Sequence, residues 1–187
     1  MNPETIHTER LVLRIYTPEI SNHIFNELNS KELQEFLGIE KEDDLSRERN
    51  KYYDSLTTFN KKFCYFHLIE KKTSKLIGWC GFHTWYIDHN RAELGYVLND
   101  ESHMNKGYMT EVLNEVLKYG FEQMQLHRIE AFVGSNNTPS LKLTSRFNFT
   151  QEGLLREHYC KEGKMEDSLI FGLLKSEFEA AHNSTNE

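Results

Sequence analysis

A strand, a polar loop and a long amphipathic helix follow one another in the middle of the chain, and this succession limits the possible folds most strongly. Residues 91–98 alternate between apolar and other side chains, as expected of a half-buried strand. From Gly107 to Met124 the apolar residues recur every three or four positions, which predicts a helix with one apolar stripe. A second strand is expected at 129–133. The sequence therefore predicts a strand–helix–strand unit inside an α/β fold.

Further segments on both sides of this unit predict a mixed sheet. The other expected strands cover residues 10–15, 63–69, 76–86, 152–159 and 167–174. The other expected helices cover residues 17–28, 44–58 and 138–147, with a short one at the C-terminal end. Because a three-strand meander leads into the unit, we expect an α/β fold with a mixed, twisted, mostly antiparallel sheet of about seven strands, flanked by helices on both faces. The order differs from a doubly wound fold, and no G-x-G-x-x-G or P-loop motif occurs.

The length and composition are those of one globular domain. The chain has 187 residues, of which 38% are hydrophobic and 27% are charged, enough to bury a continuous core. We expect a single domain over residues 1–187, with a core at about 6–178 and a polar tail at 180–187. The three cysteines are scattered and the histidines lack metal-ligand spacing, so we expect neither a disulfide framework nor a metal site.

The net charge of the chain excludes some classes of binding partner. The chain carries 22 Lys and Arg residues against 29 Asp and Glu residues, and its formal net charge of −7 argues against a nucleic-acid binder. The N-terminus lacks the basic start and apolar run of a signal peptide, and no window has the length of a membrane span. We therefore expect a cytoplasmic protein, a monomer or homodimer, that binds neither nucleic acid nor membrane.

The loop that leads into the long helix is the strongest candidate for chemistry. It runs from Met104 to Glu111 and contains Gly107 next to Lys106. The first turn of a helix has unpaired backbone N–H groups and the positive end of the helix dipole, which together bind anions. A glycine lets a ligand approach the backbone closely. The pattern indicates a diphosphate cradle made mainly of main-chain donors; the alternative is an ordinary strand–helix loop with a turn glycine.

The order of short sequence blocks around this loop resembles the GNAT superfamily of acetyl-CoA-dependent N-acetyltransferases, and within it the RimJ/RimL type. Each block is short, but together they follow the family's order over about residues 6–178. The matching blocks are Thr8 to Arg14, Ile77 to Gly81, Ala92 to Leu98, Lys106 to Glu111, Arg128 to Val133, Asn137 to Ser140 and Glu152 to Arg156. In the loop, Met104 stands where the family usually has Gln or Arg, and Met109 where it usually has a small residue.

The resemblance implies that acetyl-CoA is the acetyl donor. It implies that the strand ending at Leu98 separates from its neighbour, so that the pantetheine arm pairs with free main-chain groups. It also implies that the bulky side chain of Met109 lies near the phosphate cradle. The donor-binding residues implied by the resemblance are Val97, Leu98, Met104, Asn105, Lys106, Gly107, Tyr108, Met109, Thr110, Asn137, Ser140 and Arg146.

Two residues are the candidates for proton transfer. Glu93 lies on the strand that leads to the loop and is the candidate general base or amine anchor, the alternative being a solvent-facing strand glutamate. The resemblance implies that Ser140 lies near the sulfur as proton donor, whereas helix capping is the ordinary role of Asn137 and Ser140. Thr144 stands where many family members have a tyrosine acid, and Arg146 is either a phosphate ligand or an exposed helix cation.

The sequence thus predicts an N-acetyltransferase that moves an acetyl group to a primary amine by direct attack in a ternary complex. The acceptor stays open between a protein N-terminus and a small-molecule amine such as an amino acid, polyamine or antibiotic. Two other classes also stay open: a catalytically weak acyl-CoA-sensing module that acts through protein contacts, and a structural protein that binds no cofactor. Turnover with some acceptor distinguishes the enzyme from the module. A melting temperature raised by acetyl-CoA distinguishes both from the structural protein.

Overall fold

The computed structural model describes residues 3–55 and 62–183, and the chain divides into two compact units. The first unit comprises Met1–Trp85 and Gly95–Val116, and the second comprises Tyr86–Leu94 and Leu117–Glu187. Strand β5 (Arg91–Leu98) and helix α4 (Tyr108–Glu122) each contribute residues to both units.

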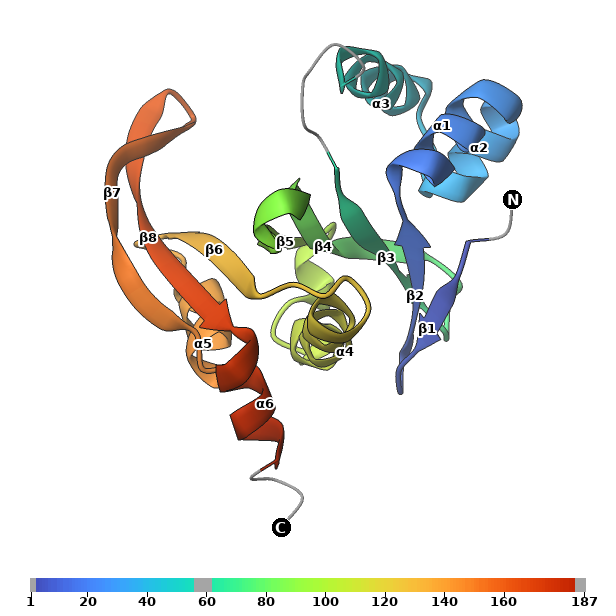
Figure 1. The fold of residues 1–187 in the computed structure, drawn as a ribbon. Helices are drawn as coiled ribbons and strands as arrows, with labels where there is room; N and C mark the ends of the chain where they lie inside the picture. Colours follow the sequence, from blue (N-terminus) through green and yellow to red (C-terminus); the bar gives the residue numbers. More distant parts are fainter. Residues whose placement is uncertain (1–2, 56–61, 184–187) are drawn as a thin grey trace. The chain divides into compact units, whose positions relative to one another are not determined.

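Antiparallel strands form the sheet of the first unit (Figure 1). In spatial order they are β1 (Thr5–His7), β2 (Leu11–Tyr16), β3 (Cys64–Glu70) and β4 (Leu76–Tyr86), followed by the last residues of β5. Their side chains alternate between two faces, because the side-chain period of a strand is two. One face buries the paired Leu13 and Leu68. The other carries Arg14, His67 and Trp79, which are register partners across β2, β3 and β4.

Three helices follow β2 and pack on one another in the first unit (Figure 1). They are α1 (Pro18–Glu27), α2 (Ser30–Leu37) and α3 (Glu42–Ser55). Helix α1 begins as the sequence predicts, with Thr17 at the cap and Pro18 at the first position. The shared core of the three helices consists of Ile20, Ile24, Phe25, Leu33, Leu45 and Tyr52. The expected helix at 44–58 corresponds to α3, and its last three expected positions lie outside the described residues.

Helix α2 is missing from the sequence prediction, although both of its ends carry recognisable signals. The Asn29 side chain accepts the Glu32 N–H at 3.1 Å and the Glu32 carboxylate accepts the Asn29 N–H at 3.0 Å, which is a capping box. Gly38 ends the helix with a φ of +66°, and a side chain there would also meet Leu76 Cβ at 2.8 Å. With only 8 residues, α2 is too short for its apolar periodicity to be distinctive.

The second unit contains the first residues of β5 and three more strands. These are β6 (Arg128–Gly134), β8 (Lys164–Leu174) and β7 (Thr150–Lys161) in spatial order. Strands β5 and β6 run parallel, whereas β6 with β8 and β8 with β7 run antiparallel. The long β7–β8 hairpin turns at Glu162 and Gly163, both with positive φ, as the sequence predicts (Figure 1). Helices α5 (Thr138–Arg146) and α6 (Lys175–Asn183) belong to the same unit.

The predicted fold class is confirmed, and besides helix α2 three details differ. The described residues form eight strands rather than about seven, because the 3-residue β1 was not expected. The helix expected from Gly107 begins at Tyr108. Helix α6 extends to Asn183, so residues 180–183 of the expected tail are helical, and 184–187 lie outside the described residues. In the part of the chain that is described, no helix has both the length and the apolar character needed to cross a membrane.

Candidate active site

The loop before α4 has the backbone conformation of an anion cradle. Asn105 and Gly107 have φ angles of +58° and +77°, and the loop from Met104 to Gly107 is exposed. Helix α4 begins directly afterwards, and the first N–H groups of a helix have no carbonyl partner within it. A Cβ added to Gly107 would find a single heavy atom within 4 Å, Nη2 of Arg10 at 3.7 Å. The space beside this glycine is therefore open to a ligand.

A carboxylate in the first turn of α4 is neutralised by the segment around β2. Glu111 Oε1 accepts hydrogen bonds from the Thr8 hydroxyl at 2.5 Å and from the Arg10 N–H at 2.7 Å. Glu111 Oε2 accepts a third from Arg10 Nε at 2.7 Å. Burial alone would raise the pKa of Glu111, but the hydrogen bonds from Arg10 and Thr8 bring that pKa below its ordinary value. A negative charge that would repel a phosphate at this helix start is thus balanced by Arg10.

Arg10 also holds the loop itself. Its Nη1 donates to the Lys106 carbonyl at 2.9 Å, and its guanidinium lies 4.3 Å from the centroid of the Tyr108 ring. The Tyr108 hydroxyl in turn donates to Glu70 Oε1 on β3 at 2.5 Å. Loop, helix start and sheet are therefore joined through one arginine. No local sequence pattern predicts a site role for Arg10, although it belongs to one of the matching blocks and Glu111 to another.

The side chain of Met109 is only 8% exposed and belongs to the buried core. Its place near the phosphate cradle stays a prediction. Tyr108 is buried to the same degree, whereas Thr110 is half-buried. Met104 is 45% exposed and Lys106 is also exposed. The first-turn residues of α4 can therefore contribute main-chain N–H groups, while Lys106 offers a mobile cation in solvent.

The end of β5 leads into this loop. Its parallel ladder with β6 covers Arg91 to Glu93, and in the described residues that ladder includes neither Val97 nor Leu98. Val97 is 42% exposed and Leu98 is half-buried. The strand is anchored within the first unit by the next residue, because the Asn99 N–H donates to the Ile77 carbonyl of β4 at 2.9 Å.

Glu93 lies half-buried on β5 in the second unit, and its register partner on β6 is Glu130. The Glu130 carboxylate accepts hydrogen bonds from Arg91 Nη1 at 2.7 Å and Arg128 Nε at 2.9 Å. Arg128 also pairs with Glu152, and its hydrogen bonds lower the pKa of Glu152 below its ordinary value. This ion-pair network assigns Glu130 and Glu152 a structural role. Glu93 stays the candidate base on this strand.

Helix α5 carries the other predicted site residues in the second unit. The Asn137 side chain accepts the Ser140 N–H at 3.2 Å, so its expected capping role is confirmed. Ser140 is half-buried in the first turn, and its role as proton donor stays a prediction. Thr144 is buried, and its hydroxyl donates to the Leu141 carbonyl of the same helix at 3.0 Å. Its proton is therefore already used in a hydrogen bond within α5. Arg146 is exposed in the last turn.

A cavity of about 620 Å³ in the first unit is lined by residues from β2, β3, β4 and α3. Tyr65 and Trp79 contribute aromatic walls, with ring centroids 4.9 Å apart. Trp79 lies at this cavity. The carboxylates of Asp44 and Glu48 from α3 also line it, each paired with a cation of the same helix, Arg47 or Lys51. The aromatic faces are therefore the feature that suits an organic cation.

The comparisons with known proteins agree with these features. The profile of the acetyltransferase (GNAT) domain matches residues 10–150. The chain is 35% identical over 180 residues to the uncharacterized N-acetyltransferase p20 of Bacillus licheniformis, which covers 94% of this chain and 98% of the relative. The chain belongs to the GNAT family of acetyltransferases. It is therefore an N-acetyltransferase of the family that uses acetyl-CoA.

Solved structures extend the likeness of this GNAT protein at the level of the fold. A spermidine N-acetyltransferase from Vibrio cholerae, in complex with CoA and spermine, has a TM-score of 0.64 at 23% identity and covers 91% of this chain and 98% of its own. An acetyltransferase for an alanine of a ribosomal protein, from Vibrio fischeri, has a TM-score of 0.67 at 18% identity and covers 94% and 98%. The two relatives are described as acting on different amines, so the shared GNAT fold alone does not select an acceptor.

Proposed function

We propose that this GNAT protein transfers an acetyl group from acetyl-CoA to a primary amine by direct attack in a ternary complex, with residues 1–187 acting as one domain. The observation that carries the proposal is the open cradle before α4, where two left-handed residues precede a helix start and Arg10 cancels the charge of Glu111. A match of the family profile to residues 10–150, which belong to both units, supports the single domain.

The donor site in this proposal uses main-chain groups more than side chains. The N–H groups of residues 107–110 bind the pyrophosphate, and Lys106 adds a flexible cation beside them. Asn105 accepts the left-handed conformation that the loop needs, as asparagine does more readily than most residues. Main-chain groups of Val97 and Leu98 pair with the pantetheine arm, which agrees with their position beyond the β5–β6 ladder. Asn137, Ser140 and Arg146 complete the proposed set.

Acetyl-CoA supplies the activated thioester. Glu93 removes a proton from the attacking amine, directly or through a water, because an amine must be neutral to act as a nucleophile. Main-chain N–H groups stabilise the negative charge that develops on the thioester oxygen. Ser140 gives a proton to the departing thiolate. The choice of Ser140 on α5 is supported by the hydrogen bond that the Thr144 hydroxyl donates to the Leu141 carbonyl, because that hydroxyl proton is already in use.

The acceptor is a primary amine that carries positive charge before it binds. The aromatic side chains of the 620 Å³ cavity support this choice, because an ammonium group is attracted to ring faces. Two acceptor classes fit this description, a protein N-terminus and a small-molecule polyamine. The solved structures named above include an acetyltransferase for an alanine of a ribosomal protein and one for spermidine.

An acceptor screen tests the function. The purified protein is incubated with acetyl-CoA and a panel of N-terminal peptides, amino acids, polyamines and aminoglycosides, while the release of free thiol is followed. We expect acetyl-CoA to be consumed with at least one acceptor and the product to gain one acetyl group. Saturable binding of acetyl-CoA without turnover across the panel would support the acyl-CoA-sensing module instead, and no binding at all would contradict both.

A further inference from the structure

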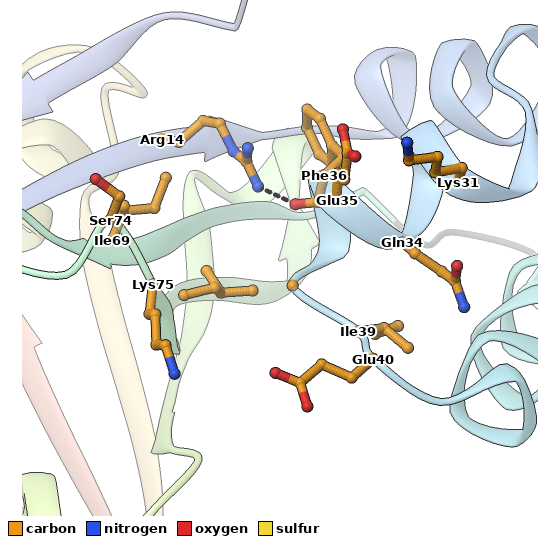
Figure 2. Close-up of a pocket in the computed structure, with 12 residues that line it drawn as sticks. Arg14, Lys31, Gln34, Glu35, Phe36, Ile39, Glu40, Ile69, Ser74 and Lys75 are labelled. Atoms are coloured by element: carbon orange, nitrogen blue, oxygen red, sulfur yellow. Dashed lines mark hydrogen bonds between the residues drawn. The ribbon is translucent and has the colours of Figure 1, made fainter.

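A second cavity in the first unit surrounds an arginine that the acetyl-transfer chemistry does not use. It has a volume of about 510 Å³ and lies between α2, the ends of β2 and β3, and the start of β4 (Figure 2). Arg14 of β2 reaches into it beside Phe36 of α2, while Lys31 and Lys75 stand at other sides of the cavity (Figure 2). Ile39, Ile69 and Leu76 add apolar surface.

Hydrogen bonds use only some of the N–H donors of the Arg14 guanidinium. Nη2 donates to the Phe36 carbonyl and also lies 2.9 Å from Nδ1 of His67. The guanidinium carbon lies 3.7 Å from the centroid of the Phe36 ring. Nε is buried without a hydrogen-bond partner in the structure, and within the described residues Nη1 makes no hydrogen bond. No carboxylate of the described residues forms a salt bridge with Arg14.

His67 cannot serve as the missing counter-charge. Burial, reinforced by the charge of Arg14, lowers the pKa of His67 to about 3, so the ring is neutral at physiological pH and its Nδ1 accepts the arginine N–H. Burial likewise lowers the pKa of Arg14 to about 10, which still leaves it charged. A half-buried cation without an anion carries a desolvation cost, and an anion that enters the cavity would recover part of that cost.

The composition of the cavity indicates which anion fits. Its charged side chains are three cations, Arg14, Lys31 and Lys75, and two carboxylates, Glu35 and Glu40. These side chains have a net charge of +1, which suits a ligand with one negative charge better than a ligand with two. The apolar side chains favour a ligand with a short hydrocarbon body. We propose that this cavity binds the carboxylate of an organic monocarboxylic acid, with Arg14 as its principal cation.

Three ligands of equal chain length test this site: hexanoate, hexylamine and 6-aminohexanoate, with inorganic phosphate as the other anion. Binding is measured by calorimetry and by the melting temperature at constant ionic strength. We expect hexanoate to bind and hexylamine to give no comparable heat or shift. Arg14→Met, which keeps an apolar side chain in place, should weaken hexanoate binding at least about tenfold. Arg49→Met removes an arginine of α3 that lines neither of the two cavities and should leave the hexanoate affinity unchanged.

The outcomes against the proposal are distinct. Equal binding of hexanoate and hexylamine would show unspecific apolar association, and tighter binding of phosphate would show a site for inorganic anions. An unchanged hexanoate affinity in Arg14→Met would remove Arg14 from the site. If Arg14→Met does not fold, Arg14→Gln replaces it, because glutamine keeps a hydrogen-bond donor for the Phe36 carbonyl but has no charge; an unchanged affinity in that variant would overturn the proposal equally.

Kinetics distinguish the two possible sources of the carboxylate. If it belongs to the acceptor, Arg14→Met lowers kcat/KM for 6-aminohexanoate but not for hexylamine. If it belongs to a separate ligand, hexanoate binds with the same affinity in the presence of a saturating amine acceptor. Either result supports the site. The hexanoate measurement needs no turnover, so it can fail or succeed independently of the proposed acetyl transfer.

Discussion

At the scale of single residues, two glutamates that are register partners have different assigned roles. Glu130 is held by Arg91 and Arg128 in an ion-pair network, which makes it structural, whereas Glu93 is the candidate base. Their alternating strand positions look alike in the sequence. The distinction between them arises from strands β5 and β6 coming together and from side chains far apart along the chain, which no local pattern records.

Replacing Glu93 by glutamine tests its role as base. Glu93→Gln keeps the size of the side chain but cannot take a proton, so we expect kcat to fall about a hundredfold or more while the affinity for acetyl-CoA stays within about twofold. The exposed Glu122→Gln on α4 is the control and should change neither value. An unaltered kcat in Glu93→Gln would exclude Glu93 as the base.

His67 makes the stability of the fold depend on pH. Its pKa is lowered to about 3 by burial, whereas an unfolded histidine binds its proton near its ordinary value of 6.5. Between these values the unfolded chain binds more protons than the folded one, so the free energy of unfolding decreases as the pH falls from 6.5 towards 3. The slope from this residue is at most about 1.4 kcal/mol per pH unit.

Urea unfolding of wild type and His67→Gln between pH 7 and 5 measures this contribution. Glutamine can still accept the hydrogen bond from Arg14 but does not titrate, so we expect a flatter pH dependence in the variant. His83, whose pKa is also lowered by burial, contributes equally to both proteins. Parallel curves for the two proteins would contradict the assignment.

At the scale of elements, the donor cradle depends on the contact between the segment around β2 and the start of α4. Arg10 bonds the Glu111 carboxylate and the Lys106 carbonyl at once, with Nε and Nη1. A lysine has one nitrogen and cannot hold both in this geometry. We therefore expect Arg10→Lys to raise KM for acetyl-CoA roughly tenfold and to leave kcat within about twofold, since Arg10 acts by positioning the loop.

Arg49 on α3, whose Nη2 donates to Ser30 Oγ at the surface, provides the matched control. Arg49→Lys keeps the positive charge at a position that lines neither cavity, so KM for acetyl-CoA should not change. Steady-state kinetics with both variants make the comparison. Arg10 would not be a positioning residue of the loop if KM for acetyl-CoA in Arg10→Lys equalled the wild-type value, or if kcat alone fell.

The elements differ in how well the sequence predicts them. Strand β4 and strand β5 have the expected bounds, because long alternating segments carry a strong signal. Strand β1 and helix α2 were not predicted. With 3 and 8 residues respectively, they are too short to show a clear apolar periodicity. The cradle was predicted because a helix start with a glycine has local chemistry. The Arg10–Glu111 clamp was not, since its two members lie 101 positions apart.

At the scale of the whole molecule, the protein has a net charge of −7, and the phosphates of acetyl-CoA are negative as well. The net charge therefore repels the donor. A cradle of main-chain N–H groups can still bind the phosphates, because it does not need a basic surface. We propose that the excess of acidic residues favours the other substrate, a cationic amine, by raising its rate of encounter.

The dependence on ionic strength tests this idea. We expect kcat/KM for 1,6-diaminohexane to fall several-fold between low and high salt, and that for hexylamine to fall less, because the dication is steered more strongly. The values of kcat should change little, since steering affects encounter and not the chemical step. Equal salt dependence for both amines would contradict a role for the surface charge.

The central claim is that acetyl-CoA binds at the loop before α4, and calorimetric titration of acetyl-CoA into three proteins tests it most directly. Gly107 and Gly163 have φ angles of +77° and +80°, so valine strains the backbone similarly at both, but only Gly107 lies in the cradle. We predict that Gly107→Val weakens acetyl-CoA binding at least about tenfold, while Gly163→Val binds as the wild type does. Wild-type affinity in a folded Gly107→Val would contradict the account.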